Sequence, residues 1–581
     1  MSKENLEALW HSTAHVFAEA ITNLYPKTKI AIGPPIEQGF HYDFELEKGV
    51  KEEDLKKIEE EMQKIIDRQD NLEQKFVSIS EAKKLFKNNS YKIEMINDLE
   101  KEGEKKISVF SNGKFMDMCK GPHIKNIGEI KAFKLMKISS AYWKGDEKNK
   151  QLIRVYGISF KTKEELDEFL KDKEKSENND HNKIGRELNL FMTHELVGQG
   201  LPLLMPRGAK IFQILTRFIE DEEEKRGYVY TRTPYMAKSD LYKVSGHWEH
   251  YKDGMFIMGN ENDKEVLALR PMTCPYQFLI YKNGLKSYKD LPIKFAETSV
   301  LFRNESSGEM HGLTRVRQFT LSEGHVIVTP EQLENEFKEV IHLIDYVMET
   351  LGIKEDITYR FSKWDPENKK GKYIDNKEAW EHSQKEMKKI LDHLKINYEE
   401  AEGEAAFYGP KLDLQAKNVY GKEDTIITVQ IDFALPERFD MTYIDKDGKK
   451  KRPYIIHRSS IGCYERTMAM IIEKCGGSFP TWLAPEQLII IPVSDKFSEE
   501  AQKINQQLLE EGIRSKLDNR NESLGYRIRD AQKIKCPYIG VIGAKEIESK
   551  SISIRNRKGE QFVLKVNEFI EKIKKEIIEK K

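Results

Sequence analysis

Hydrophobic and polar positions change their spacing along the chain, and these changes mark out its segments. Between residues 51 and 73 apolar side chains recur every three or four positions, which predicts one amphipathic helix. Its apolar positions are Leu55, Ile58, Met62, Ile65 and Ile66. Residues 155–160 predict a strand. Charged residues dominate positions 161–183, so we expect a charged linker helix there, after a first domain at 1–160.

The remainder of the chain divides again near residue 483. Residues 184–482 mix strand-like runs such as ITVQIDF and YIIHRSS with helical segments, and this region is too long for a small binding module. Residues 485–581 instead alternate short strands with helices, from LIIIPV to YIGVIGAKE, the pattern of an α/β unit. We therefore predict an α+β protein of several domains that ends in an α/β domain.

Length and charge narrow the class of protein. A chain of 581 residues exceeds what one hydrophobic core usually organises. The net charge of -1 excludes a uniformly basic coat, so any contact with nucleic acid must come from local patches. The sequence has no run of about 18 apolar residues and no signal-like start, so we expect a cytoplasmic protein with no membrane partner. Its 5 cysteines lack CxxC spacing, which predicts thiols or metal ligands.

Two charged motifs lie far apart in residues 184–482. The first, FRNESSGEMHGLTRVRQFT, predicts a strand, a loop and a second strand, with Arg303 and Glu305 on the same side of the first strand. Such a pair could bind a phosphate and an adenine amino group, although an isolated pair of this kind also fits an ordinary surface hairpin. In the second motif, HRSSIGCYERTMAMIIE, a strand runs into an apolar helix near whose start Arg466 lies.

Together the two motifs resemble those of class II aminoacyl-tRNA synthetases, and Pro234 resembles a residue of their first, dimer-forming motif. Longer strings are similar in order and spacing to threonyl-tRNA synthetases: SGHWEHYKDGMF, RPMTCP, RVRQFT, AAFYGPKLD, RFDMTY and IHRSSIG. The resemblance covers essentially the whole chain. It implies an antiparallel-sheet catalytic core at 184–482, an α+β editing domain at 1–160 and an α/β anticodon-binding domain at 485–581. The resemblance also implies a homodimer that activates L-threonine with ATP and Mg²⁺ and then charges tRNA(Thr).

The resemblance also assigns roles to residues of the core. Arg303 and Arg466 match ligands of the ATP phosphates, Glu305 matches an adenine contact, and His247 matches a residue near the terminal ribose of tRNA. Read without the resemblance, His247 could equally be a surface histidine beside a helix. The remaining matches are Arg315, Phe319 and Gln430 for ATP, Lys411 in the catalytic set, and Met272, Glu323, Tyr408 and Cys463 for the substrate.

Cys274, His325 and His457 come from three distant segments, and on spacing alone they could be a buried thiol and two structural histidines. The resemblance implies that they bind one Zn²⁺ per chain, and their donor types suit a tetrahedral site. Three protein ligands leave a position for the amino group and hydroxyl of threonine. Valine lacks that hydroxyl, and an apolar pocket separates such isosteres by only about 100-fold.

In the first domain, His11 and His15 have the spacing of one helix face, and Cys119 and His123 follow in DMCKGPH. Read alone, these residues could form a second metal site or be structural. The combination resembles the editing domain of threonyl-tRNA synthetases, which hydrolyses seryl-tRNA without an evident need for metal. Further editing positions are matched by Lys92 and Asp117. The anticodon-reading positions of the last domain are matched by Asn521, Arg529, Glu546 and Arg555, types suited to reading single-stranded bases.

Some positions depart from the family pattern. The chain starts at the editing domain, without the small ubiquitin-like domain common in bacterial members. In RQFTLSEGH, Leu321 replaces a polar residue and Glu323 an aspartate, while Cys463 replaces a serine and PMTCPYQ a more common PMNCPGH. One alternative is a prolyl-, histidyl- or glycyl-tRNA synthetase, which shares the core and the last domain but has no need of the three ligands. The other is a non-catalytic RNA-binding relative, which would be expected to lose Arg303, Glu305 or Arg466, and all three are present.

Overall fold

The computed structural model describes residues 3–260, 263–367 and 373–581. The chain forms two compact units, Met1–Lys175 and Ser176–Lys581. Helix α5 (Lys163–Asn179) crosses the boundary between them, inside the range where the charge pattern predicts a linker helix. Within the described ranges, we find no helix that is both long and apolar enough to cross a membrane.

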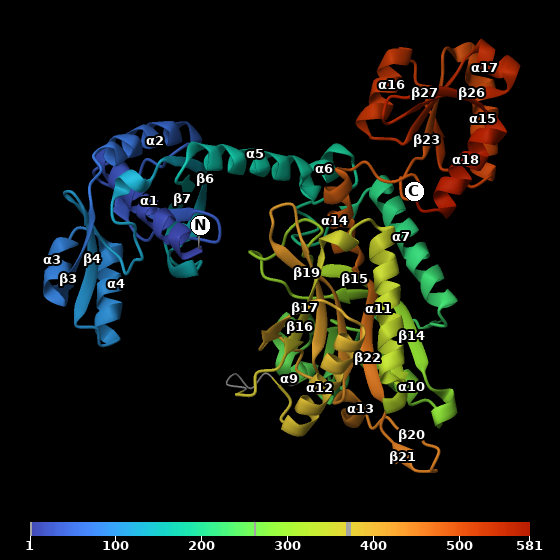
Figure 1. The fold of residues 1–581 in the computed structure, drawn as a ribbon, viewed down its shortest axis with the longest axis horizontal. Coiled ribbons are helices and arrows are strands. Elements are labelled where there is room, and N and C mark those ends of the chain that lie inside the picture. The colour runs from blue at the N-terminus through green and yellow to red at the C-terminus, as the bar shows by residue number, and fades with distance from the viewer. Residues whose placement is uncertain (1–2, 261–262, 368–372) are drawn as a thin grey trace. The chain divides into compact units, whose positions relative to one another are not determined.

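The first unit contains a four-stranded antiparallel sheet that packs against two helices, α1 (Lys3–Leu24) and α2 (Glu52–Asp67), in one core (Figure 1). The strands, in spatial order, are β1 (Lys29–Ile30), β2 (Phe40–Glu45), β7 (Gln151–Phe160) and β6 (Ala132–Tyr142). All five apolar positions that predict α2 are buried in it. The helix ends earlier than the predicted residue 73, because Gln69 has a left-handed φ of 55° that a right-handed helix cannot contain.

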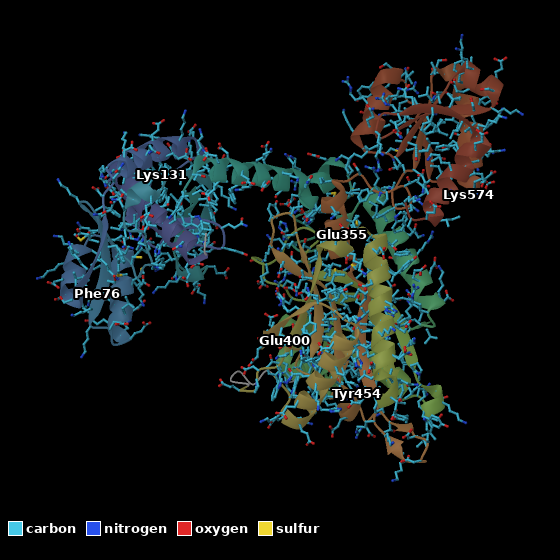
Figure 2. The ribbon with its side chains drawn as sticks, viewed as in Figure 1. Phe76, Lys131, Glu355, Glu400, Tyr454 and Lys574 are labelled. Atoms are coloured by element: carbon cyan, nitrogen blue, oxygen red, sulfur yellow. The ribbon has the colours of Figure 1, made fainter. Side chains whose placement is uncertain are left out.

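A second, three-stranded antiparallel sheet completes the first unit, with α3 (Ile79–Leu85) and α4 (Ser90–Lys101) packed against it. Its strands are β3 (Leu72–Ser78), β4 (Lys106–Asn112) and β5 (Phe115–Met118). Phe76, labelled in Figure 2, lies on β3 and is 64% exposed. Strand β5 ends at Met118, so Cys119 follows directly after the sheet.

An eight-stranded sheet forms the centre of the second unit (Figure 1). The six inner strands are antiparallel, and only the edge pairs β10–β14 and β16–β17 are parallel. The spatial order is β10 (Val229–Tyr230), β14 (Ile293–Phe302), β15 (Gln318–Val328), β22 (Tyr454–Cys463), β19 (Glu423–Asp432), β18 (Lys411–Lys417), β16 (Ile357–Lys363) and β17 (Tyr398–Glu402). The expected antiparallel core is confirmed.

Helices bury their apolar faces against this sheet in the largest hydrophobic core of the protein. They are α7 (Pro206–Lys225), α11 (Leu333–Thr350), α12 (Lys377–His393) and α14 (Tyr464–Cys475). Helix α14 starts directly after β22, as the second motif predicts, so Arg466 lies in its first turn. A shorter helix, α10 (Cys274–Tyr281), begins at Cys274.

The first motif differs in one respect from its prediction. Strand β14 ends at Phe302, so Arg303 and Glu305 lie beyond it rather than on one face of a strand. The N–H of Glu305 donates to the carbonyl of Arg303 at 2.9 Å, a tight turn that ends the alternation of side chains. The two residues therefore reach the same cavity through a turn and not through strand periodicity.

The C-terminal part of the second unit has its own mixed five-stranded sheet, flanked by α15 (Ser498–Glu510), α16 (Leu524–Lys533), α17 (Ala544–Ser549) and α18 (Val566–Ile578). The strand order is β24 (Ser515–Leu517), β23 (Leu488–Pro492), β25 (Tyr538–Ile542), β26 (Ser551–Asn556) and β27 (Gln561–Lys565), which confirms the α/β prediction. Arg207 of α7 pairs with Glu486 at 2.9 Å and donates to the carbonyl of Ile534, so polar contacts join this part to the core.

Candidate functional site

A cavity of about 340 Å³ in the second unit collects nearly all the core residues that the sequence singles out. Its lining includes His247, Met272, Cys274, Arg303, Glu305, Arg315, Phe319, Glu323, His325, Tyr408, Gln430, His457, Cys463 and Arg466. Lys411 is not in this lining. It pairs in register with Gln430 across two strands, and its Nζ lies 2.7 Å from Oδ2 of Asp413.

Sheet pairing brings the three predicted metal ligands together. His325 on β15 lies directly opposite His457 on β22, and Cys274 begins the helix beside them. One ligand atom from each residue lies within 4.8 Å of the other two, and all three residues are buried. One thiol and two imidazoles this close together are the donor types of a tetrahedral zinc site with three protein ligands.

Two further side chains orient the histidines. Nδ1 of His325 lies 2.5 Å from Oε1 of Gln277, while its Nε2 is buried without a hydrogen-bond partner in the protein. Nε2 of His457 lies 2.9 Å from Oδ2 of Asp432, which leaves Nδ1 of that ring as the free ligand atom. Metal-bound histidines usually donate their other N–H to such a group, so the donor set fits a zinc ion.

Sequence reasoning missed both Gln277 and Asp432. Gln277 lies three residues after Cys274, on the same face of α10, so its helical position could have drawn attention to it. Asp432 ends β19 and also accepts hydrogen bonds from the main-chain N–H groups of Ala434 and Leu435. Burial raises the pKa of the Cys274 thiol, whereas a bound cation would favour the thiolate.

Three arginines also line the cavity. The guanidinium of Arg303 lies 5.0 Å from the ring centre of Phe319. Arg315 pairs with Glu305 at 2.8 Å. Arg466 donates to the carbonyls of Thr314 and Thr425, and its Nε lies 2.9 Å from the first. Guanidinium groups converging on one cavity suit the planar, multidentate binding of phosphates.

Four further residues of the lining are polar: Glu323, Tyr408 and Gln430, which are half-buried, and Cys463, which is buried. Both carboxylate oxygens of Glu323 accept from the N–H of Thr273 at 3.1 Å, and burial raises the pKa of Glu323. The hydroxyl of Tyr408 donates to Gln430, and its ring stacks on His457 at 5.0 Å. Cys463 donates to Glu465, so the thiol that departs from the family pattern is engaged inside the cavity.

His247 is buried rather than on the surface. It is 4% exposed at the start of α9 (His247–Tyr251), and its ring meets Phe407 edge-on at 5.1 Å. Its Nδ1 lies 2.8 Å from Oγ of Ser245. Burial is the main reason why its pKa falls to about 3, so the imidazole is neutral near neutral pH.

A second cluster lies in the first unit, where α1 brings His11 and His15 to one face. The Sγ of Cys119 lies 3.1 Å from Nε2 of His11 and 3.2 Å from Nε2 of His123. Burial lowers the pKa of His11, lowers that of His123 to about 2, and raises that of Cys119 to about 11. The four ligand atoms also lie within 4.8 Å of one another, a spacing that would admit a metal ion.

Lys92 and Asp117 form a buried ion pair beside this cluster, with Nζ and Oδ1 2.5 Å apart. The hydroxyl of Tyr42, which sequence reasoning missed, donates to Oδ2 of Asp117 at 2.5 Å. The charge of Asp117 partly offsets the lowering of the His11 pKa by burial. The charge of Lys92 further lowers the pKa of His15, which burial already lowers. The six predicted editing residues therefore form one neighbourhood.

The four predicted anticodon residues come from separate segments of the C-terminal part. Asn521 precedes α16 and is exposed, as is Arg529 on that helix. Glu546 in α17 accepts the N–H of Gly543 at 2.9 Å, which caps its own helix. Arg555 lies on β26 and is half-buried, with its Nε unpaired in the protein.

Models of three domain families match the chain. Residues 107–156 match "Threonyl and Alanyl tRNA synthetase second additional domain". Residues 251–475 match "tRNA synthetase class II core domain (G, H, P, S and T)". Residues 487–576 match "Anticodon binding domain". The order of the three matches is the order of the predicted domains.

Whole-chain relatives agree with these matches. The chain is 59% identical to a threonine–tRNA ligase of Clostridium botulinum (strain Eklund 17B / Type B), over 100% of this chain and 90% of the relative. It is 47% identical to that of Geobacillus sp. (strain WCH70), over 99% and 89%. A crystal structure of the RNA binding domain of threonyl-tRNA synthetase from Cryptosporidium parvum Iowa II is similar at a TM-score of 0.64 and 33% identity, covering 68% of this chain and 98% of that one.

Proposed function

The chain belongs to the threonine–tRNA ligase family, and from this premise we propose which residues carry out its reaction. As a member of that family it is a class II ligase that joins threonine to tRNA. We assign activation of L-threonine by ATP to the cavity of the second unit. The observation that carries this assignment is the meeting, in one cavity, of the Cys274, His325 and His457 set with the three arginines.

We assign one zinc ion to Cys274, His325 and His457. When bound, this ion supplies a Lewis-acid position that accepts the amino group and hydroxyl of the substrate. Glu323, close to the ligands, offers a carboxylate to the substrate ammonium, and its pKa, raised by burial, would fall beside that cation. Valine offers no hydroxyl, so this donor set would reject an isostere that an apolar wall could not.

The part of the lining that contains the arginines would hold ATP with its Mg²⁺. Arg303, Arg315 and Arg466 are placed to bind phosphate oxygens, and Phe319 and Glu305 to contact the adenine. The acidic partner of Arg315 and the carbonyl partners of Arg466 keep these two side chains oriented toward the cavity, and Arg303 lies over the ring of Phe319. Gln430 also lines the cavity, and Lys411 lies opposite it on the adjacent strand, outside the lining.

We assign hydrolysis of seryl-tRNA(Thr) to the cluster of the first unit. The ester at the tRNA terminus needs a base that is neutral at physiological pH, and buried imidazoles with lowered pKa values provide one. The reacting water would be held by four side chains, those of His11, His15, Cys119 and His123. The buried ion pair of Lys92 and Asp117 beside them would keep these side chains in place. No metal is required by this assignment.

The remaining assignments concern partners and boundaries. We propose domains at 1–160, 184–482 and 485–581 with a linker at 161–183, which contains the boundary between the two compact units. Asn521, Arg529, Glu546 and Arg555 would read the anticodon of tRNA(Thr). Exposed apolar side chains beside Pro234, including Tyr235 and Met236, favour a homodimer at that motif. A cytoplasmic location would suit an enzyme of translation.

ATP–pyrophosphate exchange with threonine, serine and valine tests the core assignment, with zinc measured by elemental analysis of the same preparation. We expect strong exchange with threonine, weaker exchange with serine, none above background with valine, and one zinc per chain. Cys274→Ser should lose both the zinc and the exchange while retaining the fold. Active wild-type protein without zinc would refute the metal assignment.

A further inference from the structure

Residues 176–182, where the chain enters the second unit, contact separate parts of that unit. The Oγ of Ser176 donates to the carbonyl of Val419 at 2.6 Å. The carboxylate of Asp180 accepts from the hydroxyl of Tyr420 at 2.9 Å. Two hydrogen bonds thus hold residues 176–182 against the turn at 418–421. The same segment contains a buried histidine.

That histidine, His181, begins α6 (His181–Glu187) and is 0% exposed. The main-chain N–H of Leu313 lies 3.2 Å from its Nε2. An N–H can only donate, so Nε2 accepts and the ring proton is on Nδ1. Nδ1 therefore donates to Oε1 of Glu473 at 2.6 Å. Both the orientation and the tautomer of the ring are set by these two partners.

Asp180, His181 and His311 present ligand atoms close enough together for a metal ion. Both ring nitrogens of His181, however, are already engaged by Leu313 and Glu473. A metal would need one of these nitrogen lone pairs, and only an unprotonated, unoccupied nitrogen could supply it. His181 is therefore better explained as a residue that makes two structural hydrogen bonds than as a metal ligand.

The two partners of His181 belong to the elements that hold Arg466. Leu313 precedes Thr314, whose carbonyl accepts from Nε of Arg466 at 2.9 Å. Glu473 lies seven residues after Arg466 on α14, about two helical turns away. His181 thus connects the loop that carries Arg315 to the helix that carries Arg466.

The loop approaches the imidazole so closely that residue 312 must be glycine. A Cβ on Gly312 would lie 2.1 Å from Nε2 of His181, and the φ of Gly312 is +48°, in the left-handed region. The His181 ring also stacks against Phe191, with the ring centres 6.2 Å apart. The ring therefore fills a space shaped for it by both neighbours.

We propose that His181 is a positioning residue for the ATP side of the cavity. By holding the loop at 311–315 against α14, it keeps Arg315 and Arg466 directed at the same phosphates. The inference rests on the ATP roles proposed above for these two arginines. The same contacts connect residues 176–182 to the proposed ATP site.

Three substitutions separate the two hydrogen bonds of the ring. His181→Asn puts an amide near the place of Nδ1 and can keep the bond to Glu473. His181→Gln puts an amide oxygen near the place of Nε2 and can keep the bond from Leu313. His181→Phe removes both bonds but retains a ring against Phe191. His393→Phe is the matched control, because it removes a His–Glu pair of 2.8 Å from an exposed surface.

KM values for ATP and for threonine should be measured separately by pyrophosphate exchange, with trypsin cleavage after Arg315 as a readout of loop release. We expect His181→Phe and His181→Asn to raise the KM for ATP by about 10- to 100-fold and to hasten cleavage. The KM for threonine should stay within about twofold. Helix α14 is held by its own packing in the core, so the bond from Leu313 is the one that fixes the loop, and His181→Gln, which keeps this bond, should recover most of the ATP affinity. The His393 control should match wild type.

The proposal is overturned if all variants keep the wild-type KM for ATP, or if Asn rescues and Gln does not. Should the Phe variant fail to fold, the comparison of Asn with Gln still decides. Arg466→Lys distinguishes this failure from failure of the proposed function. If that variant raises the KM for ATP while the His181 variants are silent, only the inference on His181 is wrong. If it leaves the KM unchanged, the ATP site itself is misassigned.

Discussion

Gln277 accepts a hydrogen bond from Nδ1 of His325 across 2.5 Å, and its own amide nitrogen donates to Oγ1 of Thr231 at 2.7 Å. Thr231 in turn donates to Glu297, which pairs with the buried Arg270. Gln277 is therefore fixed from behind by a continuous set of polar contacts. Its carbonyl can accept but not donate, so it selects the tautomer of His325 whose Nε2 is free to bind a metal.

Gln277→Ala should weaken zinc binding by about 10- to 100-fold, because the ring of His325 would lose its fixed tautomer and orientation. Competition with a chromogenic chelator measures this affinity independently of catalysis. Gln332→Ala is a suitable control, since it removes a half-buried glutamine that is bonded to the carbonyl of Leu291 at 2.8 Å and does not line the cavity, whereas Gln277 is fully buried. Equal zinc affinity in wild type and Gln277→Ala would contradict the role of this side chain.

Some of this architecture follows directly from local sequence. The spacing of Leu55, Ile58 and their neighbours predicts α2 because a helix that buries one face must repeat near 3.6 residues. The same rule puts His11 and His15 on one face of α1. In both cases the information lies within one element, so it can be read without knowing what packs against it.

Other features depend on pairing between distant segments and cannot be obtained from spacing. His325 and His457 meet because β15 and β22 are neighbours in register, a fact that neither strand encodes alone. Asp432 becomes a partner of His457 through a third strand, β19. Arg303 and Glu305 share a cavity through a turn after Phe302, where a hydrogen bond between main-chain groups overrides the expected alternation.

Arg303→Lys should lower the rate of threonyl-adenylate formation by at least about tenfold, or ~1.4 kcal/mol of transition-state stabilisation. The change keeps the charge but replaces a planar fork by a point charge, and it loses the stacking on Phe319. Single-turnover pyrophosphate exchange at saturating threonine measures the effect. The control is Lys252→Arg, the reverse exchange of one cationic side chain for another, at a residue whose Nζ lies over the ring of Trp248. A rate for Arg303→Lys within about twofold of wild type would count against the assignment.

Replacing Asn521 and Arg529 together by Ala should raise the KM for tRNA in the charging reaction and leave pyrophosphate exchange unchanged. Both side chains are exposed, so their loss should not disturb the fold. Each lost contact to a base edge is worth roughly 1 to 3 kcal/mol by analogy with other base-reading contacts. Lys516→Ala with Lys533→Ala removes two cations from the same part and tests for a purely electrostatic effect. Unaltered charging at sub-saturating tRNA would refute the assignment.

The hydrolysis of seryl-tRNA should depend little on pH between about 6 and 8. Burial lowers the pKa of His11 and brings that of His123 to about 2, so the neutral imidazoles persist well below the ordinary histidine value. Cys119, with a pKa raised to about 11, stays a thiol through the same range, so its ionisation adds no further pH dependence to the rate. Rates on preformed seryl-tRNA, corrected for spontaneous hydrolysis at each pH, provide the measurement. Loss of half the activity near pH 6.5 would indicate an unperturbed histidine and contradict the proposed environment.

Changing His11 and His15 together to Ala should separate charging from editing. Serine has the hydroxyl that the proposed zinc site requires and lacks only one methyl of threonine, a difference worth about 10- to 200-fold in binding. Translation needs nearer 10⁴-fold, so a second, hydrolytic site must remove the remaining errors. The two imidazoles lie beside Cys119 and His123 in the first unit, and neither is among the residues that line the cavity assigned to threonine activation. We therefore expect pyrophosphate exchange and threonine charging close to wild type, together with accumulation of seryl-tRNA(Thr). His41→Ala, which removes another buried histidine of the same unit, controls for loss of packing. If the double variant deacylates preformed seryl-tRNA at the wild-type rate, the paired histidines are structural and the editing site lies elsewhere.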